Sequence, residues 1–558
     1  MAKRPPIAVL VLAVLGGGSV LWGVALSLQG PPVSTPTGVA VTPTQTAQPS
    51  SKPPGVGPTQ TGSGTWKEDA PTTTQTATTQ ALCPDCDVVV ITMCSLRRDH
   101  VSAYGPTAGV NLTPRLDALM DGAFRMDQAW AASNFTLAGL TAVLTGRFGS
   151  TTGVTGWDKG LVKDVPTLPE VLGVYGYRTG AFTIDAPSGF RPDYGLDRGF
   201  QHMEIIPPPR DTPDGRTREG EVGPGGDSAR PAAAWIAAQD KSQPLLAMFH
   251  TRTAHYPFVL ENDPDDPTGI TQLLWDSGSI SSKGQAMPGT AGGTAQRGVV
   301  QIAGPDPVQV GVRKAGAAGV AVWKKLYAES VRRMDLDIGV MADALAARGR
   351  LDKTVIIVLA DHGESLDDHG ELLHGDAYFD GVVHIPMLVK VPGGKGGPVS
   401  ALASQVDVLP TLLDLVGAVV PAGIDGASMV PLFTGTAASI RTTALIEGGV
   451  SWRDDAKHPR GAVIAPPWAL LRQDRGCGGT GESARGPGEP ASCLYNLLAD
   501  PGQEKNVAAA NKEVVTDLLG RWDKFRAARA GEAATLILDP KYIEELQRTG
   551  YDFRPGSK

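Results

Sequence analysis

The chain has 558 residues, of which 69 are glycine and 45 are proline, and its formal net charge is −8. This length is enough for one large α/β domain with insertions, or for two domains. The acidic balance and the lack of any long basic run exclude a surface built to bind nucleic acid. Five cysteines in so long a chain exclude a disulfide scaffold.

The N-terminus combines basic residues with a long apolar run. Lys3 and Arg4 precede the uncharged segment 7–28, which is long enough to cross a bilayer and longer than a typical signal-peptide core. The basic residues favour a cytoplasmic N-terminus at 1–6 and an exported body. We expect an uncleaved anchor in a bacterial-type cell membrane, with the body in the periplasm or outside the cell; a cleaved signal and a secreted body are the alternative.

Residues 29–82 are dominated by proline, threonine, serine and glutamine. A segment of this composition cannot bury a core, and it is typical of an extended or disordered linker. The sequence therefore predicts a tether between the apolar segment and a globular body that begins near Cys83.

The body alternates strand-like runs with helical segments. Continuous apolar, β-branched runs predict buried strands at 88–93, 244–250 and 354–364, the last of which runs directly into polar residues. Helical spacing predicts helices at 112–123 and 327–349, and 167–183 is typical of a helix, a glycine turn and a strand. The alternation predicts an α/β fold with a doubly wound, mostly parallel sheet over 83–440. In such sheets ligands bind at the carboxyl ends of the strands.

Two regions depart from this alternation. Residues 261–322 are rich in glycine, serine, aspartate and proline, and we expect a partly irregular insertion near the opening of the site. Residues 441–558 mix short strands with a helical segment at 511–530, which predicts a smaller C-terminal α+β lobe. Within this lobe Cys477 and Cys493 are the expected disulfide in an oxidising compartment.

The remaining cysteines lie near the start of the body. Cys83 and Cys86 lack further zinc ligands nearby, and they precede a strand, whereas a redox Cys-x-x-Cys pair normally opens a helix. We expect a local disulfide or free thiols at these two positions. Cys94 stands alone at the end of the first strand.

Several segments, in the right order and spacing, resemble the sulfatase-like members of the alkaline phosphatase superfamily over about residues 87–510. The matching segments are 88–105, 113–146, 167–182, 249–258, 334–375, 406–417 and 493–508. The resemblance implies an alkaline phosphatase-like fold and hydrolysis of a sulfate or phosphate ester. It also implies one divalent metal ion, because such an ion neutralises the charge that grows on the ester.

Asp361 and His362 stand where the strand at 354–364 becomes polar, on the family's second metal segment. Bulky polar residues are costly at the end of a buried strand unless they bind something. We expect both to ligate the metal, which would be calcium, magnesium, manganese or zinc. The alternative is a helix cap followed by a surface histidine.

Thr136 aligns with the nucleophile of the family. Typical sulfatases place there a cysteine or serine, within Cys/Ser-x-Pro-x-Arg, that is converted to formylglycine. Residues 136–140 read Thr-Leu-Ala-Gly-Leu, so the convertible residue, the proline and the arginine are all missing. The resemblance then favours a threonine hydroxyl that acts beside the metal and contributes to its binding. The alternative is a threonine that caps a helix.

Cys94 occupies the position of a metal-binding aspartate in relatives. A thiolate can bind a divalent ion, but it selects softer metals, so zinc is favoured if Cys94 is a ligand. The alternative is a small buried hydrophobe, which is how most free cysteines behave.

His255 and His374 align with residues that contact the anion in relatives, and we expect catalytic roles for both; surface histidines are the alternative. A later family pattern is altered, because relatives carry a glutamate and an arginine where this chain has Gly381 and His384.

The favoured interpretation is a membrane-tethered, exported hydrolase of sulfate or phosphate esters with a metal-assisted threonine nucleophile. Its partners would be an anionic ester substrate and, through the N-terminal segment, a membrane. The alternative is a catalytically impaired relative that acts as a binding module, which the three departures from the family pattern support. A lipid-linked phosphoglycerol or phosphoethanolamine transferase ranks last, because such enzymes have several membrane spans. Whether the protein is an active enzyme stays open at this point.

Overall fold

The structure is a computed structural model. It describes residues 81–105, 109–184, 190–206, 227–256, 258, 307–375, 377–448, 459–473, 476–477, 491–529, 531, 533–540, 542–543 and 546. The chain divides into two units, Met1–Thr74 and Gln75–Lys558, and every described residue belongs to the second. The expected membrane segment 7–28 and the linker up to residue 80 lie outside the described residues. No helix in the described part of the chain is both long and apolar enough to cross a bilayer.

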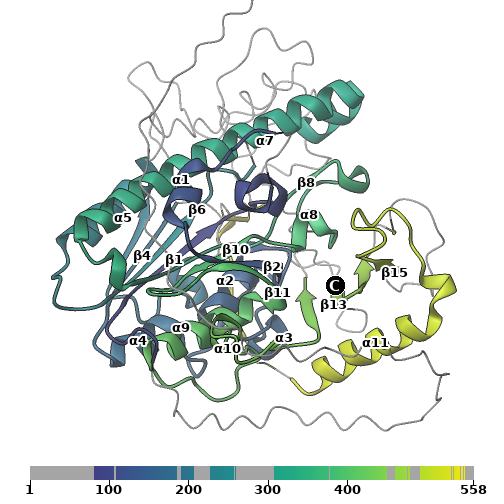
Figure 1. Ribbon diagram of the computed structural model, residues 1–558. Helices are drawn as coiled ribbons and strands as arrows, with labels where there is room; N and C mark the ends of the chain where they lie inside the picture. The colour runs from purple at the N-terminus through teal and green to yellow at the C-terminus, as the bar shows by residue number, and fades with distance from the viewer. Residues whose placement is uncertain are drawn as a thin grey trace, which may run out of the picture. The chain divides into compact units, whose positions relative to one another are not determined.

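A mostly parallel sheet of eight strands forms the centre of the body (Figure 1). The strand order is β11-β2-β10-β7-β1-β6-β4-β5, and β10 is antiparallel to both of its neighbours. The strands are β1 (Asp87–Met93), β2 (Phe124–Trp130), β4 (Arg178–Ile184), β5 (His202–Ile206), β6 (Leu245–Thr251), β7 (Thr354–Ala360), β10 (Met387–Lys390) and β11 (Gly397–Ser404). The predicted fold class is confirmed.

The three central strands β1, β6 and β7 are buried along their whole length. Their apolar, β-branched sequences fit a strand that is covered on both faces of a parallel sheet. Helices supply that cover, with α1 (Pro114–Leu119), α5 (Arg230–Ala238) and α7 (Pro307–Arg348) on one face, and α2 (Thr136–Thr145), α4 (Leu168–Val174) and α9 (Val408–Val416) on the other (Figure 1). The predicted strand positions are confirmed.

The helix predicted at 327–349 is confirmed and is longer than expected. It begins at Pro307, inside the region 261–322 that was expected to be a partly irregular insertion. Residues 307–322 of this region are helical apart from non-helical torsion angles at Gly316, and residues 261–306 lie outside the described residues, so the predicted insertion stays a prediction. The helix ends before Gly349, whose φ of 67° is favourable only for glycine.

Short elements complete the body. They are α3 (Gly149–Thr152), β3 (Lys159–Leu161), β8 (Ser365–Leu366), β9 (Leu372–Leu373), α8 (Asp380–Val383), α10 (Val430–Phe433) and β16 (Ala533–Thr535). β16 pairs with β3, so a segment near the C-terminus returns to the large domain.

The C-terminal lobe contains a four-stranded antiparallel sheet, as expected of the smaller lobe. Its strands are β12 (Ala444–Glu447), β13 (Gly461–Ala465), β14 (Trp468–Gln473) and β15 (Ala491–Asn496). Helix α11 (Lys512–Ala527) buries Leu518 and Trp522 in the same hydrophobic cluster as residues of this sheet.

Two disulfides tie loops of the described chain. Cys477 pairs with Cys493, as predicted, and Cys83 pairs with Cys86. Cys94 is the free cysteine, and it is fully buried. The free-thiol alternative for Cys83 and Cys86 is therefore not the arrangement that the structure adopts.

One buried acid holds the amino ends of the central strands to the end of α7. Asp87, at the start of β1, is fully buried and pairs with Arg348 Nε at 2.7 Å and with Arg350 Nε at 3.2 Å. Its Oδ1 also accepts a hydrogen bond from the backbone nitrogen of Leu245 at 3.0 Å. The carboxylate thus joins β1, β6 and the chain between α7 and β7.

We predict that Asp87→Ala destabilises the body by about 3–5 kcal/mol, because it leaves the buried Arg348 guanidinium without a counter-charge. Urea unfolding followed by circular dichroism measures the change. Asp121→Ala, at an exposed position, is the matched control and should shift the unfolding free energy by less than about 0.5 kcal/mol. Equal effects of the two substitutions would contradict a structural role for the buried pair.

Candidate active site

The three central strands end side by side at one edge of the sheet. β1 lies between β7 and β6, and Met93 is in register with Ala360 on one side and Thr251 on the other. Cys94 and Asp361 each follow the last residue of their strand directly, and His250 precedes the last residue of β6. Parallel pairing alone therefore brings these three side chains together.

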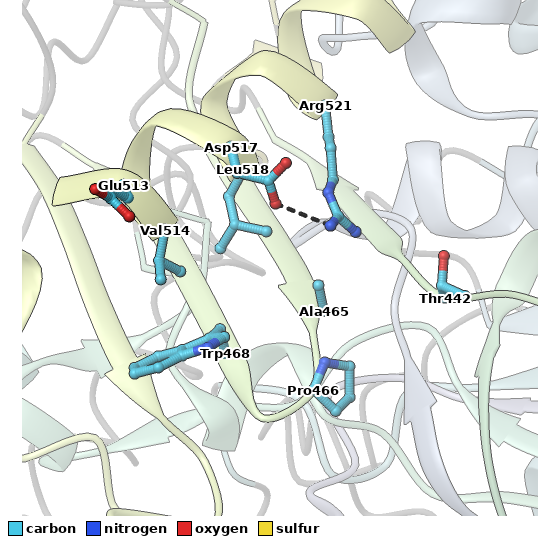
Figure 2. A pocket seen from close by; sticks show the side chains of 9 residues that line it. All are labelled: Thr442, Ala465, Pro466, Trp468, Glu513, Val514, Asp517, Leu518 and Arg521. Atoms are coloured by element: carbon cyan, nitrogen blue, oxygen red, sulfur yellow. Dashed lines mark ion pairs between the residues drawn. The ribbon is translucent and has the colours of Figure 1, made fainter. Parts of the chain in front are cut away.

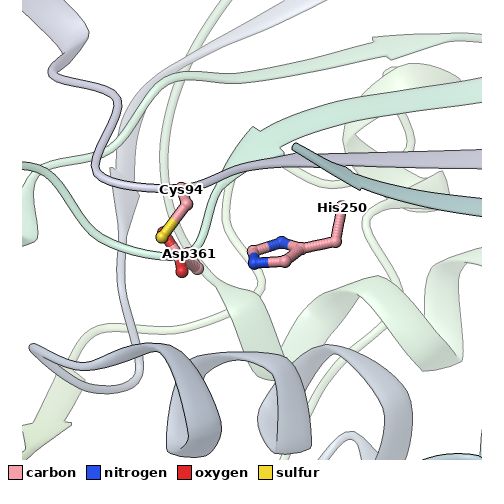
Figure 3. A group of neighbouring side chains, drawn as sticks. All are labelled: Cys94, His250 and Asp361. Atoms are coloured by element: carbon pink, nitrogen blue, oxygen red, sulfur yellow. The ribbon is translucent and has the colours of Figure 1, made fainter. Parts of the chain in front are cut away.

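Cys94, His250 and Asp361 form a compact cluster. One potential ligand atom from each residue lies within 4.8 Å of the others, and all three side chains are fully buried. Figure 3 shows the imidazole of His250 pointing toward Cys94 and Asp361, with each residue on a different segment. Sulfur, imidazole nitrogen and carboxylate oxygen make a donor set that suits zinc better than calcium or magnesium.

The hydrogen bonds among the described residues leave one side-chain atom of Asp361 and one of His250 without a partner. Asp361 Oδ1 accepts from the backbone nitrogens of Ser95 at 3.0 Å and His362 at 2.7 Å. His250 Nδ1 is 2.9 Å from Thr92 Oγ1. Asp361 Oδ2 and His250 Nε2 are buried and have no hydrogen-bond partner among the described residues. Unpaired buried polar atoms are costly, so these two atoms fit a bound cation.

Burial shapes the charge of the cluster. Burial, together with the Asp361 carboxylate, raises the pKa of the Cys94 thiol well above its usual range. Burial also lowers the pKa of His250 to about 4. Burial opposes ionisation of Asp361, but interactions with His362 and His250 outweigh it and lower the pKa of this carboxyl. The protein alone thus holds a neutral thiol, a neutral imidazole and a carboxylate, and a bound cation would favour the thiolate.

Thr136 lies next to this cluster. Its Oγ1 is 3.5 Å from Cys94 Sγ and 3.2 Å from His362 Nε2. His362 Nδ1 donates to the carbonyl of Gly363 at 2.8 Å, so Nε2 is the unprotonated nitrogen and accepts from the threonine hydroxyl. Phe135 is the N-cap of α2, and Thr136 is the first helical residue. The alternative in which Thr136 only caps the helix is therefore wrong.

A glutamine fixes the position of α2 against the end of β7. Gln405 Nε2 donates to the carbonyls of Ala360 at 2.9 Å and Asp361 at 2.7 Å, and its Oε1 accepts from the backbone nitrogen of Ala132 at 2.8 Å. Gly139, in the first turn of α2, lies so close that a Cβ would stand 2.9 Å from the carbonyl oxygen of Asp361. These contacts hold the helix that carries Thr136 against the strand end that carries Asp361.

The predicted histidines gather in a row beside Thr136. The rings of His362 and His374 have centroids 4.1 Å apart, and those of His374 and His255 are 5.0 Å apart. His374 Nδ1 is 3.0 Å from Glu364 Oε1, and His255 Nδ1 donates to the carbonyl of Tyr256. All three rings are buried, so the alternative of surface histidines is wrong. Burial raises the pKa of Glu364 to about 8 and lowers the pKa of His362 to about 4.

The departure from the family pattern at Gly381 has a packing reason. Arg97 lies against Gly381 so closely that a Cβ there would collide with its guanidinium group. Arg97 Nη1 donates to the carbonyl of Glu364 at 2.8 Å, and the side chain also pairs with Asp99 and Asp368. The missing side chain at Gly381 makes room for an arginine that braces the loop after β7.

His384 likewise has a structural role. Its ring stacks on Trp130 with centroids 4.3 Å apart, and its Nδ1 is 2.8 Å from Asp380 Oδ1. The residue thus fastens α8 to the end of β2 and takes no part in the Cys94–His250–Asp361 cluster.

Sequence reasoning placed Cys94, Asp361, Thr136 and His362 at one site, and the structure brings all four together. It missed His250 as a candidate ligand. The signal was present, since His250 is a polar residue at the end of a predicted buried strand, within a segment that resembles the family. His362 Nε2 is 3.6 Å from Asp361 Oδ2, and its role as a ligand stays a prediction.

A separate cavity of about 420 Å³ lies in the C-terminal lobe and shares no lining residue with this site. Figure 2 shows its lining residues on α11 and around the β13–β14 turn, with Thr442 just before β12, and an ion pair between Asp517 and Arg521. The Asp517 Oδ2 to Arg521 Nη2 distance is 2.8 Å, so these two charges already satisfy each other. Nothing in the lining resembles a metal or nucleophile site.

Comparison with known proteins gives the family. A sulfatase family model matches residues 87–418, which is more than half of the chain. Arylsulfatase K of Danio rerio is 30% identical over 182 residues, covering 32% of this chain and 33% of that protein. N-acetylglucosamine-6-O-sulfatase of Bacteroides thetaiotaomicron is 25% identical over 391 residues, covering 60% of this chain and 69% of that protein. The matched segment thus covers about a third of the full length of that arylsulfatase K.

Solved structures agree on the fold. A 2-O GAG sulfatase superposes with a TM-score of 0.58 at 18% identity, covering 82% of this chain and 96% of that chain. The phosphonate monoester hydrolase of Agrobacterium radiobacter superposes with a TM-score of 0.59 at 20% identity, covering 81% and 97%. At these identities the likeness concerns the fold alone. The family model covers the strands and loops that carry the site, and the chain belongs to the sulfatase family.

Proposed function

We propose that this protein is an exported hydrolase of sulfate esters that uses Thr136 as its nucleophile beside a divalent metal. Cys94, His250 and Asp361 would hold the metal, and zinc suits their atoms best. The observation that carries the proposal is the position of the Thr136 hydroxyl, which contacts both Cys94 Sγ and His362 Nε2. When bound, the metal would neutralise charge on the ester and make the adjacent hydroxyl more acidic.

In the first step, Thr136 Oγ1 attacks the sulfur of the ester while its proton passes to His362 Nε2. The bond between sulfur and the leaving-group oxygen breaks. That oxygen takes a proton from the Glu364–His374 pair, whose members lie 3.0 Å apart. His362 is suited to accept the proton, because its Nδ1 is already committed to the carbonyl of Gly363.

In the second step, a water oxygen attacks the sulfur of the sulfated threonine, and the sulfur–Oγ1 bond breaks. Thr136 regains its proton from His362, and one proton of the water returns to the Glu364–His374 pair. The products are the free alcohol and hydrogen sulfate, and every catalytic group is back in its starting state.

The names of relatives support a sulfated sugar as the substrate class. Two relatives from Bacteroides thetaiotaomicron are N-acetylglucosamine-6-O-sulfatase and Delta 4,5-hexuronate-2-O-sulfatase, the latter 22% identical over 432 residues. A phosphate ester is the second candidate, because the superfamily resemblance covers both esters. Turnover of 4-nitrophenyl sulfate against 4-nitrophenyl phosphate separates the two.

Export is supported by two features of the chain. The disulfides Cys83–Cys86 and Cys477–Cys493 fit an oxidising compartment. The apolar segment 7–28 behind Lys3 and Arg4 fits an anchor, with the disulfide-bonded body on the outer side of the membrane.

We predict that the full chain, purified without chelator, carries about one equivalent of zinc. Asp361→Ala and His250→Ala should lower the bound zinc to background, because each removes a buried ligand atom. Metal analysis by mass spectrometry measures this. The control is Asp352→Ala, which removes an exposed acid and should leave the zinc content unchanged.

We predict that Cys94→Asp shifts the metal preference from zinc toward calcium or magnesium, because a carboxylate oxygen replaces the sulfur. Competition between zinc and calcium, read by metal analysis, measures the shift. An unchanged preference would mean that Cys94 does not contact the metal.

We predict that Thr136→Ala lowers kcat for sulfate-ester hydrolysis by at least about 10³-fold and leaves the zinc content close to wild type. Thr136→Ser should retain most of the activity, because it keeps the hydroxyl. Thr145→Ala is the control, since that hydroxyl lies on the same helix and, within the described residues, bonds the carbonyl of Thr141 and the backbone nitrogen of Arg147. Zinc binding with no turnover of any ester in the wild type would favour the binding-module alternative.

A further inference from the structure

The turn that carries Cys94 is held in a backbone conformation that residues other than glycine rarely adopt. β1 ends at Met93, and Ser95, the residue after Cys94, has a φ of 58°. A side chain makes this left-handed conformation unfavourable, so contacts from the surrounding structure must hold it. The direction in which the chain leaves β1, and with it the position of Cys94, therefore depends on those contacts.

The same turn is joined to the metal cluster through backbone nitrogens. The nitrogen of Ser95 donates to Asp361 Oδ1 at 3.0 Å, and the nitrogen of Cys94 donates to the carbonyl of Thr251 at 2.8 Å. Ser95 is fully buried. One turn thus determines both where Cys94 Sγ lies and how the carboxylate of Asp361 is oriented.

Tyr327 on α7 holds the other side of this turn. Its hydroxyl donates to the carbonyl of Ser95 at 2.7 Å and accepts from the backbone nitrogen of Arg97 at 2.8 Å. The side chain is fully buried, and burial raises the pKa of Tyr327 well above its usual range, so the hydroxyl keeps the proton that it donates. A single hydroxyl therefore satisfies two backbone groups of the turn, one of them on the residue with the positive φ.

The ring of Tyr327 is itself fixed by aromatic neighbours. It meets the ring of His100 edge-on with centroids 4.9 Å apart, and the ring of Phe258 edge-on with centroids 5.7 Å apart. His100 lies shortly after the turn, and Phe258 lies on the chain that follows β6. Because these contacts come from separate segments, the hydroxyl is held in place against the end of β1 before any ion binds.

We propose that Tyr327 is a positioning residue of the metal centre: by holding the Ser95 carbonyl, it sets where Cys94 Sγ meets the ion. This inference rests on the proposed function, since it requires a metal at the Cys94–His250–Asp361 cluster. Without the hydroxyl, Ser95 loses a contact that supports its left-handed conformation. Relaxation of the turn then moves the sulfur and the nitrogen that orients Asp361.

The test loads the full-length protein with cobalt in place of zinc, because cobalt bound to a thiolate has a charge-transfer absorption band that zinc lacks. We expect the wild type to show this band, and Tyr327→Phe to weaken it and to lower the affinity for cobalt about 10- to 100-fold. Titration followed by absorption spectroscopy measures both. Phenylalanine keeps the ring contacts with His100 and Phe258, so the variant should fold.

Tyr177→Phe is the matched control. Tyr177 is also buried, and its hydroxyl donates to the carbonyl of Cys86 at 2.8 Å, just before β1 begins. It thus lies at the opposite end of the strand from Cys94. The melting temperature should fall by a similar amount in both variants, whereas the cobalt band and affinity should change only in Tyr327→Phe. A Tyr327→Phe protein that matches the wild type in both, or a control that changes as much, would overturn the inference.

A second substitution tests the route through Ser95. Ser95→Gly in the Tyr327→Phe background should restore part of the cobalt affinity, because glycine adopts a φ of 58° without a steric penalty. A double variant that binds cobalt no better than Tyr327→Phe would overturn the proposed route.

The outcomes also separate this inference from the proposed function. A wild type that binds cobalt without the band would overturn the inference and leave the hydrolase, because Cys94 would then not contact the metal. A band that depends on Tyr327, in a protein that hydrolyses no ester, would sustain the inference and reject the hydrolase. A wild type that binds no metal would overturn both.

Discussion

The pairing of β1 with β7 on one side and β6 on the other is the constraint on which the site depends. Three parallel strands in register end at the same edge of the sheet. Strand pairing, and not the conformation of the connecting loops, therefore brings residues that are far apart in the sequence together. The Cys94–His250–Asp361 cluster lies at those three ends, and Thr136 on α2 lies beside it. The buried Asp87 pairs, at the opposite ends of the same strands, secure the register on which the meeting depends.

The positions of the central strands, and of two residues at their ends, could be predicted from the sequence, because buried parallel strands have a distinctive continuous apolar sequence. Uninterrupted apolar runs identified β1, β6 and β7, and the polar residues directly after β1 and β7 identified Cys94 and Asp361 as neighbours. His250 was not predicted as a candidate ligand, because it lies within β6 and not after its end. Inside a strand that is buried on both faces, the sequence does not indicate toward which face a given side chain points. The full length of α7 was not predicted, because residues 307–322 are rich in glycine and alanine and lack a clear apolar stripe.

The site keeps the layout that the resemblance predicts while its atoms differ. Cys94 supplies a thiol at the end of β1, His250 on β6 lies beside it and Asp361, and Thr136 Oγ1 is 3.5 Å from the sulfur. The cluster offers a soft set of donor atoms, and the unprotonated Nε2 of His362 accepts a hydrogen bond from the Thr136 hydroxyl.

The contact between Arg97 and Gly381 also bears on how this chain can evolve. A glutamate at position 381, as in relatives, would need the space that the guanidinium group now fills. Arg97 would first have to leave, and the loop after β7 would lose the brace at Glu364 and Asp368 in the intermediate. A larger side chain at position 381 therefore requires Arg97 to move as well. Positions 97 and 381 are thus coupled by packing, and the effects of substitutions at the two positions on stability should not be additive.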